Sequence, residues 1–438
     1  MALTDKLTAI ANAIRAKTGK TESLTLEQIP TEIESITTGG GSSDDVHYVT
    51  FRNEATGEEF VKPVATGDDC VDVVAKGLWA KPTKPSDAQY DYTFSGGWSS
   101  SDGGTADADI LKNITEDKTV YPVFVGVSIV KSGECGESAT WRLNADGVLT
   151  VAGEGDVTPQ TSASGYPWYS SKSDIVKVVF EVNVPTRAIQ NYTGVTSITL
   201  TDTVTRIDGY AFFGCAGLKN INIGSGVTSI PESAFRNCQN VTSVYIADEN
   251  AVYSGNGNCI IQKETGTILV GFNSSMIPTD GSAISIGENA FQGRISMTNI
   301  TIPDCVTSIG QNAFNSCTGL KSVTIGNGVI SIGTSAFASC TGLTSVTIGS
   351  GVTNIGDTVF YSCKLTSITI PGGVNRIGKN VFGYNGTLNS VTFENADGWW
   401  VSTDSAATTG IAVDVSDPAT NVTHFMTTYK DYYWNRSA

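Results

Sequence analysis

Residues 320–342 read "LKSVTIGNGVISIGTSAFASCTG", and residues 343–363, "LTSVTIGSGVTNIGDTVFYSC", follow with the same types of residue at most positions. The unit recurs in steps of 23 residues, as from Leu320 to Leu343, except for one step of 22, from Leu343 to Leu365, and one break of 56, from Val241 to Met297. Its first residue is Val195, Leu218, Val241, Met297, Leu320, Leu343, Leu365 or Leu388. A repeat of this length is typical of a solenoid, whose coils bury their apolar side chains against one another.

Each unit predicts two short extended segments joined by a turn. In residues 320–342, Val323 and Ile325 alternate with polar residues, which favours a strand with one buried face. Gly326 and Gly328 then allow a turn, and the apolar residues up to Ile332 predict a second extended piece.

Phenylalanine and cysteine mark the end of the units. Ala336, Phe337 and Cys340 are spaced as on one helical turn, so we expect a short helical turn there. The phenylalanines are Phe212, Phe235, Phe314, Phe337, Phe360 and Phe382, and the cysteines are Cys215, Cys238, Cys317, Cys340 and Cys363, with Asn385 in their place in a sixth unit. No histidine joins the cysteines and no C-x₂-C pair occurs, which disfavours zinc. We expect buried thiols that donate weakly to the backbone.

Composition excludes several classes of function. The chain has 438 residues, of which 40% are hydrophobic, so it predicts more than one folded unit. A net charge of −16 disfavours binding to nucleic acid or to an anionic membrane surface. The N-terminal sequence lacks the apolar run of a secretion signal, and no stretch is long enough for membrane insertion. Nine cysteines, an odd number, do not suggest a disulfide framework, which favours synthesis in a reducing cytoplasm.

The units of residues 320–363 resemble the BspA-type leucine-rich repeats of bacterial cell-surface and phage proteins. The preceding "CGESATWRLNADGVLTVAGEG" (135–155) and "PWYS" (167–170) resemble the N-terminal cap of that family, and the first of these predicts a hairpin turning at Asp146-Gly147. The resemblance implies an N-terminal cap with a degenerate first repeat at 129–194, a solenoid at 195–392 with an inserted hairpin near 247–273, and an aromatic C-terminal cap at 393–438. Trp399, Trp400, Tyr432, Tyr433 and Trp434 would cover the last coil or, alternatively, form an exposed ligand-stacking platform.

Residues 46–128 lack the repeat. "VHYVTFRN" (46–53) and "KTVYPVFVGV" (118–127) predict strands. "PTKPSDAQYDYTFSGGW" (82–98) and "LKNITEDKTVYPVF" (111–124) resemble the internalin-type β-grasp repeat of bacterial surface proteins, which implies a spacer. "DGGTADAD" (102–109) lacks the spacing of a calcium loop and is expected to be a solvated loop.

Residues 1–37 predict a helical segment for attachment or oligomerisation. Leu3, Leu7, Ile10 and Ile14 form one helical stripe, which would pack against a sister chain or a phage tail or baseplate protein. The segment resembles the N-terminal segment of phage tail and fibre-like proteins, and a Gly/Ser linker at 38–45 follows it. The expected fold is therefore mainly β with short helical turns: a leucine-rich-repeat solenoid preceded by a small β-grasp module and an N-terminal α-helical segment.

The outward positions of the first strand in each unit are candidate ligand-binding residues. They are Ser197, Thr199, Asn220, Asn222, Tyr245, Thr301, Thr324, Thr347, Thr369 and Thr392. Their hydroxyl and amide groups would hydrogen-bond a glycan, and Tyr245 would stack on a sugar ring. The alternative is that short polar residues only solvate an exposed face. Because His47 and His424 are the only histidines, we expect no catalytic site, and no cofactor or metal is predicted.

The order of segments favours a phage tail or fibre-type adhesion protein that contacts a host cell-surface glycan or protein through its solenoid. A bacterial cell-surface adhesin is the alternative, and the lack of a signal peptide and of a wall-anchoring tail argues against it. A third interpretation is a structural decoration of the virion without a ligand. The expected location is thus the virion or, in the alternative, the bacterial surface.

Overall fold

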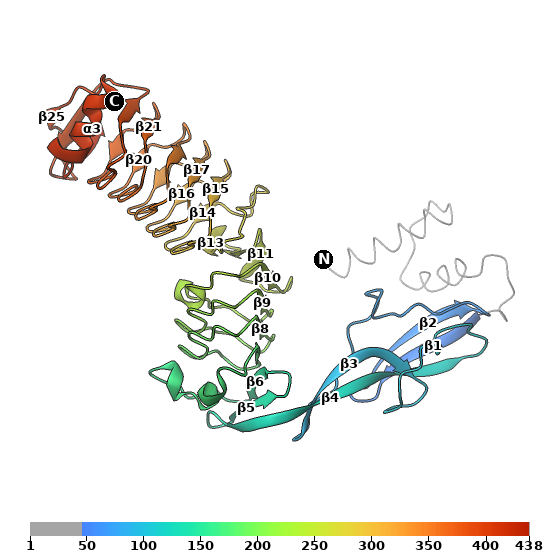
Figure 1. Cartoon of the computed structure of the whole chain (residues 1–438). Coiled ribbons are helices and arrows are strands. Elements are labelled where there is room, and N and C mark those ends of the chain that lie inside the picture. The colour runs from blue at the N-terminus through green and yellow to red at the C-terminus, as the bar shows by residue number, and fades with distance from the viewer. Residues whose placement is uncertain (1–45, 438) are drawn as a thin grey trace, which may run out of the picture. The chain divides into compact units, whose positions relative to one another are not determined.

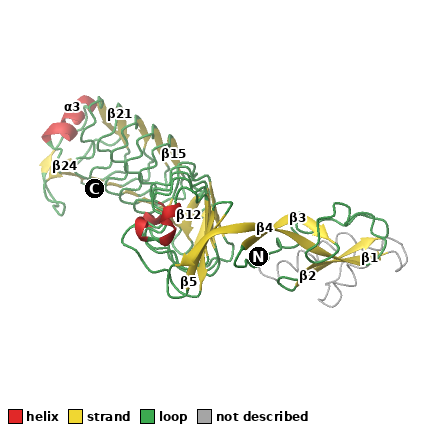
Figure 2. Ribbon diagram, turned by 60° about the horizontal axis from the view of Figure 1, so that its bottom comes forward, coloured by secondary structure: helices red, strands yellow, loops and turns green. Residues whose placement is uncertain are grey.

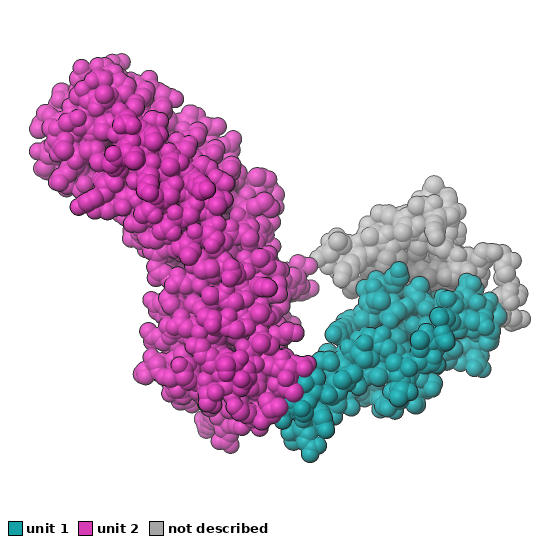
Figure 3. Space-filling view, viewed as in Figure 1, with its two compact units in different colours: residues 1–129 teal, residues 130–438 magenta. Residues whose placement is uncertain are grey.

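The computed structural model describes residues 46–437. The expected helical segment, with its stripe Leu3, Leu7, Ile10 and Ile14, and the linker lie outside the described residues. The chain forms two compact units, and the boundary between them lies between Ile129 and Val130 (Figure 3). The division falls within strand β4 (Lys118–Glu134), next to the boundary expected after residue 128. No helix in the described part of the chain is long and apolar enough to cross a membrane.

The first unit is a mixed sheet whose strands pair in the order β2-β1-β4-β3. Its other strands are β1 (Val46–Asn53), β2 (Glu58–Ala65) and β3 (Tyr90–Ser99). β1 is parallel to β4, and the two outer pairs are antiparallel. The core forms where Phe51 meets Trp98 edge to face, with ring centroids 4.7 Å apart. That this unit is a β-grasp spacer stays a prediction.

The second unit begins with the expected hairpin. Strands β5 (Ala139–Asn144) and β6 (Val148–Gly153) are antiparallel, and β7 (Lys177–Phe180) then pairs with β6 in parallel. Two 3₁₀ helices, η2 (Ala163–Gly165) and η3 (Pro167–Ser171), lie between β6 and β7 in sequence. Trp168 in η3 is fully buried, and its indole N–H donates to the carbonyl of Ala188 at 3.0 Å, which ties this segment to the first coil.

The rest of the second unit is a β-solenoid of about nine coils (Figure 1). Each regular coil contributes one strand to a long-strand ladder and, after a turn, one shorter strand to a short-strand ladder. The long strands are β7, β8 (Ser197–Leu200), β9 (Asn220–Ile223), β10 (Ser243–Ile246), β15 (Asn299–Ile302), β17 (Ser322–Ile325), β19 (Ser345–Thr347), β21 (Ser367–Ile370) and β23 (Ser390–Phe393). The short strands are β14 (Ser285–Ile286), β16 (Ser308–Ile309), β18 (Ser331–Ile332), β20 (Asn354–Ile355) and β22 (Arg376–Ile377). Both ladders are parallel, which confirms the two extended segments predicted for each unit.

The third side of each coil, which we call the Phe corner, differs from the expected helical turn. Among the described coils, only that of Phe235 forms a 3₁₀ helix there, η4 (Glu232–Phe235). In the others, one residue before the Ala-Phe or Val-Phe pair and one after it have positive φ, as Ser335 (56°) and Ser339 (59°) do around Phe337. A left-handed residue on each side prevents a continuous right-handed helix, so the corner is built of turns.

Phenylalanine rings stack inside this corner. Phe337 is fully buried, and its ring lies 5.0 Å from that of Phe314 and 5.7 Å from that of Phe360, nearly parallel to both. Burial of one such side chain contributes about 2 kcal/mol. The repeat therefore places identical rings on top of one another through successive coils.

The cysteines of the repeat donate to the preceding coil, as the sequence predicted. Cys340 Sγ donates to the carbonyl of Phe314 at 3.1 Å, and Cys317 and Cys363 make the same bond one coil earlier and later. Asn385 replaces the thiol with its side-chain amide, which donates to Phe360 O at 2.6 Å. Burial raises the pKa of Cys317 and of Cys363 to about 12, so these thiols stay protonated at neutral pH.

The turn glycines are needed because adjacent coils approach closely. A Cβ at Gly328 would lie 1.8 Å from the carbonyl oxygen of Asp304 in the preceding coil, and one at Gly351 would lie 1.9 Å from that of Asn327. Neither glycine has positive φ, so space rather than conformational freedom requires them. Cys305 stands at the same place in the coil after the insertion, where the neighbouring backbone is that of Pro278 instead of a regular turn.

The insertion near residues 247–273 contains the expected hairpin, β12 (Cys259–Gln262) with β13 (Thr267–Val270), and a further strand, β11 (Tyr253–Asn256), that extends it to a three-stranded meander. Strand β13 continues into the short-strand ladder at β14. Both faces of β12 are buried: Ile260 packs in the core of the earlier coils, and Cys259 and Ile261 pack in the core of the later ones. The insertion thus separates two hydrophobic cores within one solenoid.

Arg294 joins the coils on either side of this insertion. It occupies the cysteine position of its unit, three residues after Phe291, and is 2% exposed. Its guanidinium donates to the carbonyls of Gly271 (2.8 Å), Cys238 (3.1 Å) and Phe235 (3.4 Å). Burial lowers the pKa of Arg294, and the carbonyl oxygens offset part of that desolvation. The longer side chain bridges a gap that a cysteine would leave open.

Aromatic residues after the last coil are largely buried. The segment comprises β24 (Trp399–Ser402), β25 (Ile411–Ala412), α3 (Pro418–Thr423), the π-helical η5 (His424–Thr428) and β26 (Tyr433–Arg436). Trp399 and Trp434 are 3% and 1% exposed, which contradicts a stacking platform built on them. Helix α3 lies at this end of the solenoid (Figure 2), where the amide of Asn421 donates to Val391 O on β23 at 2.9 Å. This contact satisfies a backbone group at the sheet edge.

We expect Gly328→Ala to destabilise the solenoid by about 1–3 kcal/mol, because its Cβ overlaps the carbonyl of Asp304. Gly386→Ala is the matched control, since a Cβ there meets no atom within 4 Å. Chemical denaturation of the full chain measures both free energies of unfolding. Equal stabilities of the two variants would contradict the proposed close approach.

We also expect the native protein to react with a thiol reagent at Cys305 only, because it is half-buried and the other eight cysteines are buried. The thiol count is taken with Ellman's reagent before and after addition of denaturant. Unfolding should raise it from one to the nine cysteines of the chain. Reaction of the Cys305→Ala variant at native conditions would contradict this expectation, because at least one buried cysteine would then be accessible to the reagent.

Candidate binding surface

The ten predicted ligand-binding residues lie on the outward face of the long-strand ladder, which we call the strand face. Within each sheet they form columns in register: Thr199 pairs with Asn222, Thr301 with Thr324, and Thr369 with Thr392. The same ladder brings Ser197 beside Asn220, Asn222 beside Tyr245, and Thr324 beside Thr347. The alternation of buried and outward residues in each strand holds these side chains on one face.

The columns are exposed but not continuous. Tyr245 is 55% exposed, and the five threonines from Thr301 to Thr392 are all exposed, whereas Ser197, Thr199 and Asn222 are half-buried. The long strands belong to three sheets, of which one ends at β10, one holds β15 to β19, and one holds β21 and β23. The insertion separates β10 from β15 in sequence, so the structure does not place Tyr245 in the threonine column.

Polar groups on the strand face are only partly satisfied by one another. Asn222 Nδ2 donates to Thr199 Oγ1 at 3.4 Å, and Ser322 Oγ donates to Asn299 Oδ1 at 2.6 Å. Apart from the phenol of Tyr245, none of the ten side chains is ionisable. These ten side chains can therefore offer hydrogen bonds to a neutral ligand. The strand face also carries a charge at its start, because Lys177 on β7 is exposed and lies in register with Ser197.

A second exposed feature escaped the sequence analysis. Tyr210 and Tyr384 lie at the Phe corner and are 37% and 76% exposed, and Tyr361 lies beside Tyr384. The signal in the sequence was a tyrosine at positions where other units have serine or asparagine, such as Ser339 and Ser362.

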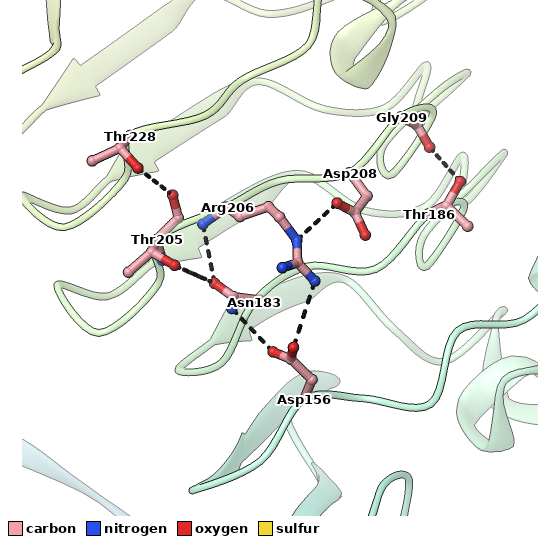
Figure 4. A network of polar contacts seen from close by, with 8 residues as sticks. All are labelled: Asp156, Asn183, Thr186, Thr205, Arg206, Asp208, Gly209 and Thr228. Atoms are coloured by element: carbon pink, nitrogen blue, oxygen red, sulfur yellow. Dashed lines mark hydrogen bonds and ion pairs between the residues drawn. The ribbon is translucent and has the colours of Figure 1, made fainter.

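The polar network at the start of the solenoid holds coils together (Figure 4). Arg206 forms ion pairs with Asp208 (3.0 Å) and Asp156 (3.5 Å). The side-chain amide of Asn183 donates to Asp156 at 3.0 Å, and its oxygen accepts from the backbone N–H of Thr205 and of Arg206. Because each group in it is bonded to a neighbouring coil or to the cap segment, we interpret this network as structural.

The two histidines lie in different units. His47 lies on β1 of the first unit, with its Nδ1 3.7 Å from a carboxylate oxygen of Asp117. His424 lies in η5 of the second unit, against the rings of Tyr429 and Trp434. Within residues 46–437, no group of three or more histidine, cysteine or acidic side chains is placed to hold a metal ion.

Comparisons with known proteins agree with this architecture. Residues 182–259 and 271–396 match the family model described as the BspA type leucine rich repeat region, in six copies. Among curated protein sequences, none matches this chain.

Several solved structures are similar to the chain. One is a leucine-rich repeat protein from Eubacterium ventriosum, at 18% identity over 57% of this chain and 94% of that one, with a TM-score of 0.31. Another is a leucine rich cell surface protein from Faecalibacterium prausnitzii, at 20% identity over 61% and 96%, with a TM-score of 0.31. A third is the pneumococcal vaccine antigen PcpA, at 14% identity over 61% and 82%, with a TM-score of 0.35. The family match covers the stacked coils, so the solenoid of this chain is similar to BspA-type leucine-rich repeats.

Proposed function

We propose that this chain is a non-catalytic binding protein of the bacterial cell surface, whose strand face contacts a glycan or a protein. The observation that carries the proposal is the alignment of exposed hydroxyl and amide side chains on successive parallel strands. The BspA-type repeats support it, since repeats that resemble these belong to bacterial cell-surface and phage proteins.

Binding through this face would be multivalent. Threonine and serine side chains each supply only a weak contact, and the threonine column offers no tryptophan or arginine of the kind that dominates binding hot spots. The strands present the same groups at a constant spacing, so a repeating ligand would engage several coils at once. Replacement of one threonine should then weaken binding only slightly, whereas replacement of several neighbouring threonines should weaken it strongly.

We expect the triple variant Thr324→Glu, Thr347→Glu and Thr369→Glu to lose adsorption while staying folded. All three residues are exposed, and the new carboxylates would replace hydroxyl donors along adjacent coils. The measurement is adsorption of the labelled full chain to intact cells and to immobilised cell-surface glycans and proteins, with circular dichroism to verify folding.

A matched control places the same charge on the opposite ladder. Gln311, Thr334 and Asn354 are also exposed and neutral, and they lie on or just after the short strands. Their change to glutamate should leave adsorption intact. Full adsorption by the folded strand-face variant would exclude the strand face as the binding surface, and equal losses in both variants would indicate a general effect of charge.

A phage tail or fibre-type adhesion protein is the second candidate. Residues 1–37 favour it, because their sequence resembles the N-terminal segment of such proteins. In that case the stripe Leu3, Leu7, Ile10 and Ile14 would attach the chain to a tail or baseplate protein, or to a second copy of itself, and the solenoid would contact the host surface. A virion decoration without a ligand would share the attachment and lack the adsorption.

For this candidate, Leu7→Glu with Ile10→Glu should abolish incorporation into phage particles, because a short helix is marginal unless its apolar stripe is buried. Immunoblots of purified particles and of bacterial envelope fractions give the distribution of the chain. Ala9→Glu, off the stripe, is the control. Normal amounts of the double variant in particles would contradict the attachment role, and recovery of the parent chain only in the envelope would favour the cell-surface protein.

A further inference from the structure

The Phe corner contains two tyrosines at backbone positions that disfavour them. The left-handed positions of this corner are occupied mainly by asparagine, serine and glycine. Tyr210 and Tyr384 are the aromatic exceptions among them, each with φ near 60°. A short polar residue tolerates this conformation, whereas a bulky aromatic residue is strained in it.

Burial does not compensate for the strain at Tyr384. Its side chain is 76% exposed, the largest exposed fraction among the large apolar and aromatic side chains of the described residues. The corresponding residues of the two preceding coils, Ser339 and Ser362, have the same left-handed conformation without a ring. The structure therefore holds an aromatic ring in solvent where the repeat otherwise uses serine.

Tyr361 forms a pair with Tyr384. Their ring centroids are 5.0 Å apart at an interplanar angle of 62°. Gly383 leaves room for this arrangement, because a Cβ there would lie 2.8 Å from Cδ2 of Tyr361. The two rings thus form an edge-to-face pair at the last regular coils, with the ring of Tyr384 mostly in solvent.

The faces of these rings are not covered by a cation, unlike those of other tyrosines. Lys84 lies over Tyr92 at 4.1 Å, Arg187 over Tyr210 at 5.5 Å, and Lys379 over Tyr433 at 4.5 Å. Across residues 46–437, no lysine or arginine is placed in this way over Tyr361 or Tyr384. The exposed ring of Tyr384 is therefore available to a ligand.

Serine hydroxyls lead up to the pair along the same corner. Ser339 donates its backbone N–H to Tyr361 O at 2.7 Å, and Ser362 donates its own to Gly383 O at 2.7 Å. These bonds align Ser339, Ser362 and Tyr384 at equivalent positions of three successive coils. Two half-buried serines therefore precede the exposed ring of Tyr384 along this corner.

We propose that Ser339, Ser362, Tyr361 and Tyr384, the tyrosine platform, bind a neutral oligosaccharide by stacking a pyranose ring on Tyr384. The C–H groups on one face of a sugar ring carry slight positive charge and are attracted to the negative face of an aromatic ring. Serine and tyrosine hydroxyls then pair with the hydroxyls of the next sugar. The net charge of −16 of the chain disfavours an acidic sugar as the preferred ligand.

This site deepens the proposed function by naming a ligand class, but it lies at a different corner from the strand face and is tested separately. The informative substitution is Tyr384→Asn, because asparagine occupies left-handed positions in other coils, such as Asn237 and Asn312. Tyr384→Phe is the matched control, because it keeps the stacking ring. A structural tyrosine and a ligand-binding tyrosine predict opposite effects of Tyr384→Asn on stability.

The experiment applies the full chain and both variants to an array of neutral and acidic glycans and records their melting temperatures. We expect the parent to bind neutral glycans, Tyr384→Asn to weaken that binding at least about tenfold, and Tyr384→Phe to stay within about threefold. The melting temperature of Tyr384→Asn should be unchanged or higher, because the strain is relieved.

Any of three results with the parent and Tyr384→Asn would overturn the proposal: no neutral glycan bound by the parent, equal binding by Tyr384→Asn, or a lower melting temperature of Tyr384→Asn accompanying its loss of binding. A fourth comes from the strand-face variant. The strand-face triple variant separates the two sites. If it keeps binding that depends on Tyr384, the platform acts independently of the strand face. If it loses that binding while folded, the glycan site lies on the strand face and the platform proposal fails.

Discussion

Parallel backbone pairing between coils is the constraint on which the rest of the solenoid depends. Strands paired in this way lie about 4.8 Å apart, so each side chain has its own counterpart in the next coil as a close neighbour. Phenylalanine satisfies this condition by stacking, cysteine by donating to a carbonyl, and glycine by leaving space. Like charges at that spacing would repel, which accounts for outward columns of threonine, serine and asparagine.

The insertion shows what happens when the neighbouring coil is not a regular one. There the glycine of the turn is replaced by Cys305, since no carbonyl of a regular turn lies where its Cβ must go. The small thiol is replaced by Arg294, whose carbonyl partners include Phe235, the Phe-corner residue of the coil before the insertion. Strand β12 is buried on both faces, and one face packs in the core of the earlier coils and the other in the core of the later coils. Departures from the repeat are therefore explained by local geometry at this junction.

The two outward surfaces follow from different backbone rules. On the strand face, alternation along each strand keeps small polar side chains in register, and any β-favouring polar residue suits the position. At the Phe corner, the left-handed backbone favours asparagine, serine and glycine, which occupy most of these positions. An aromatic residue causes no backbone strain on the strand face, but it does so at the Phe corner. The exposed Tyr384 therefore indicates a ligand-binding role more strongly than Tyr245 does.

The sequence by itself determined the period, the buried positions, the N-terminal hairpin and the register of the strand face, because solenoid contacts repeat at a fixed separation along the chain. It also indicated the thiol donors, since a lone buried cysteine in each unit has few other partners. Only the tertiary structure decided that the Phe corner consists of turns, because apolar spacing carries no information on the sign of φ at Ser335 and Ser339. It alone decided the third strand of the insertion, the burial of Arg294 and the pairing of Tyr361 with Tyr384. The first two depend on which coils flank the insertion, and the pairing depends on the space at Gly383, which no periodic pattern encodes.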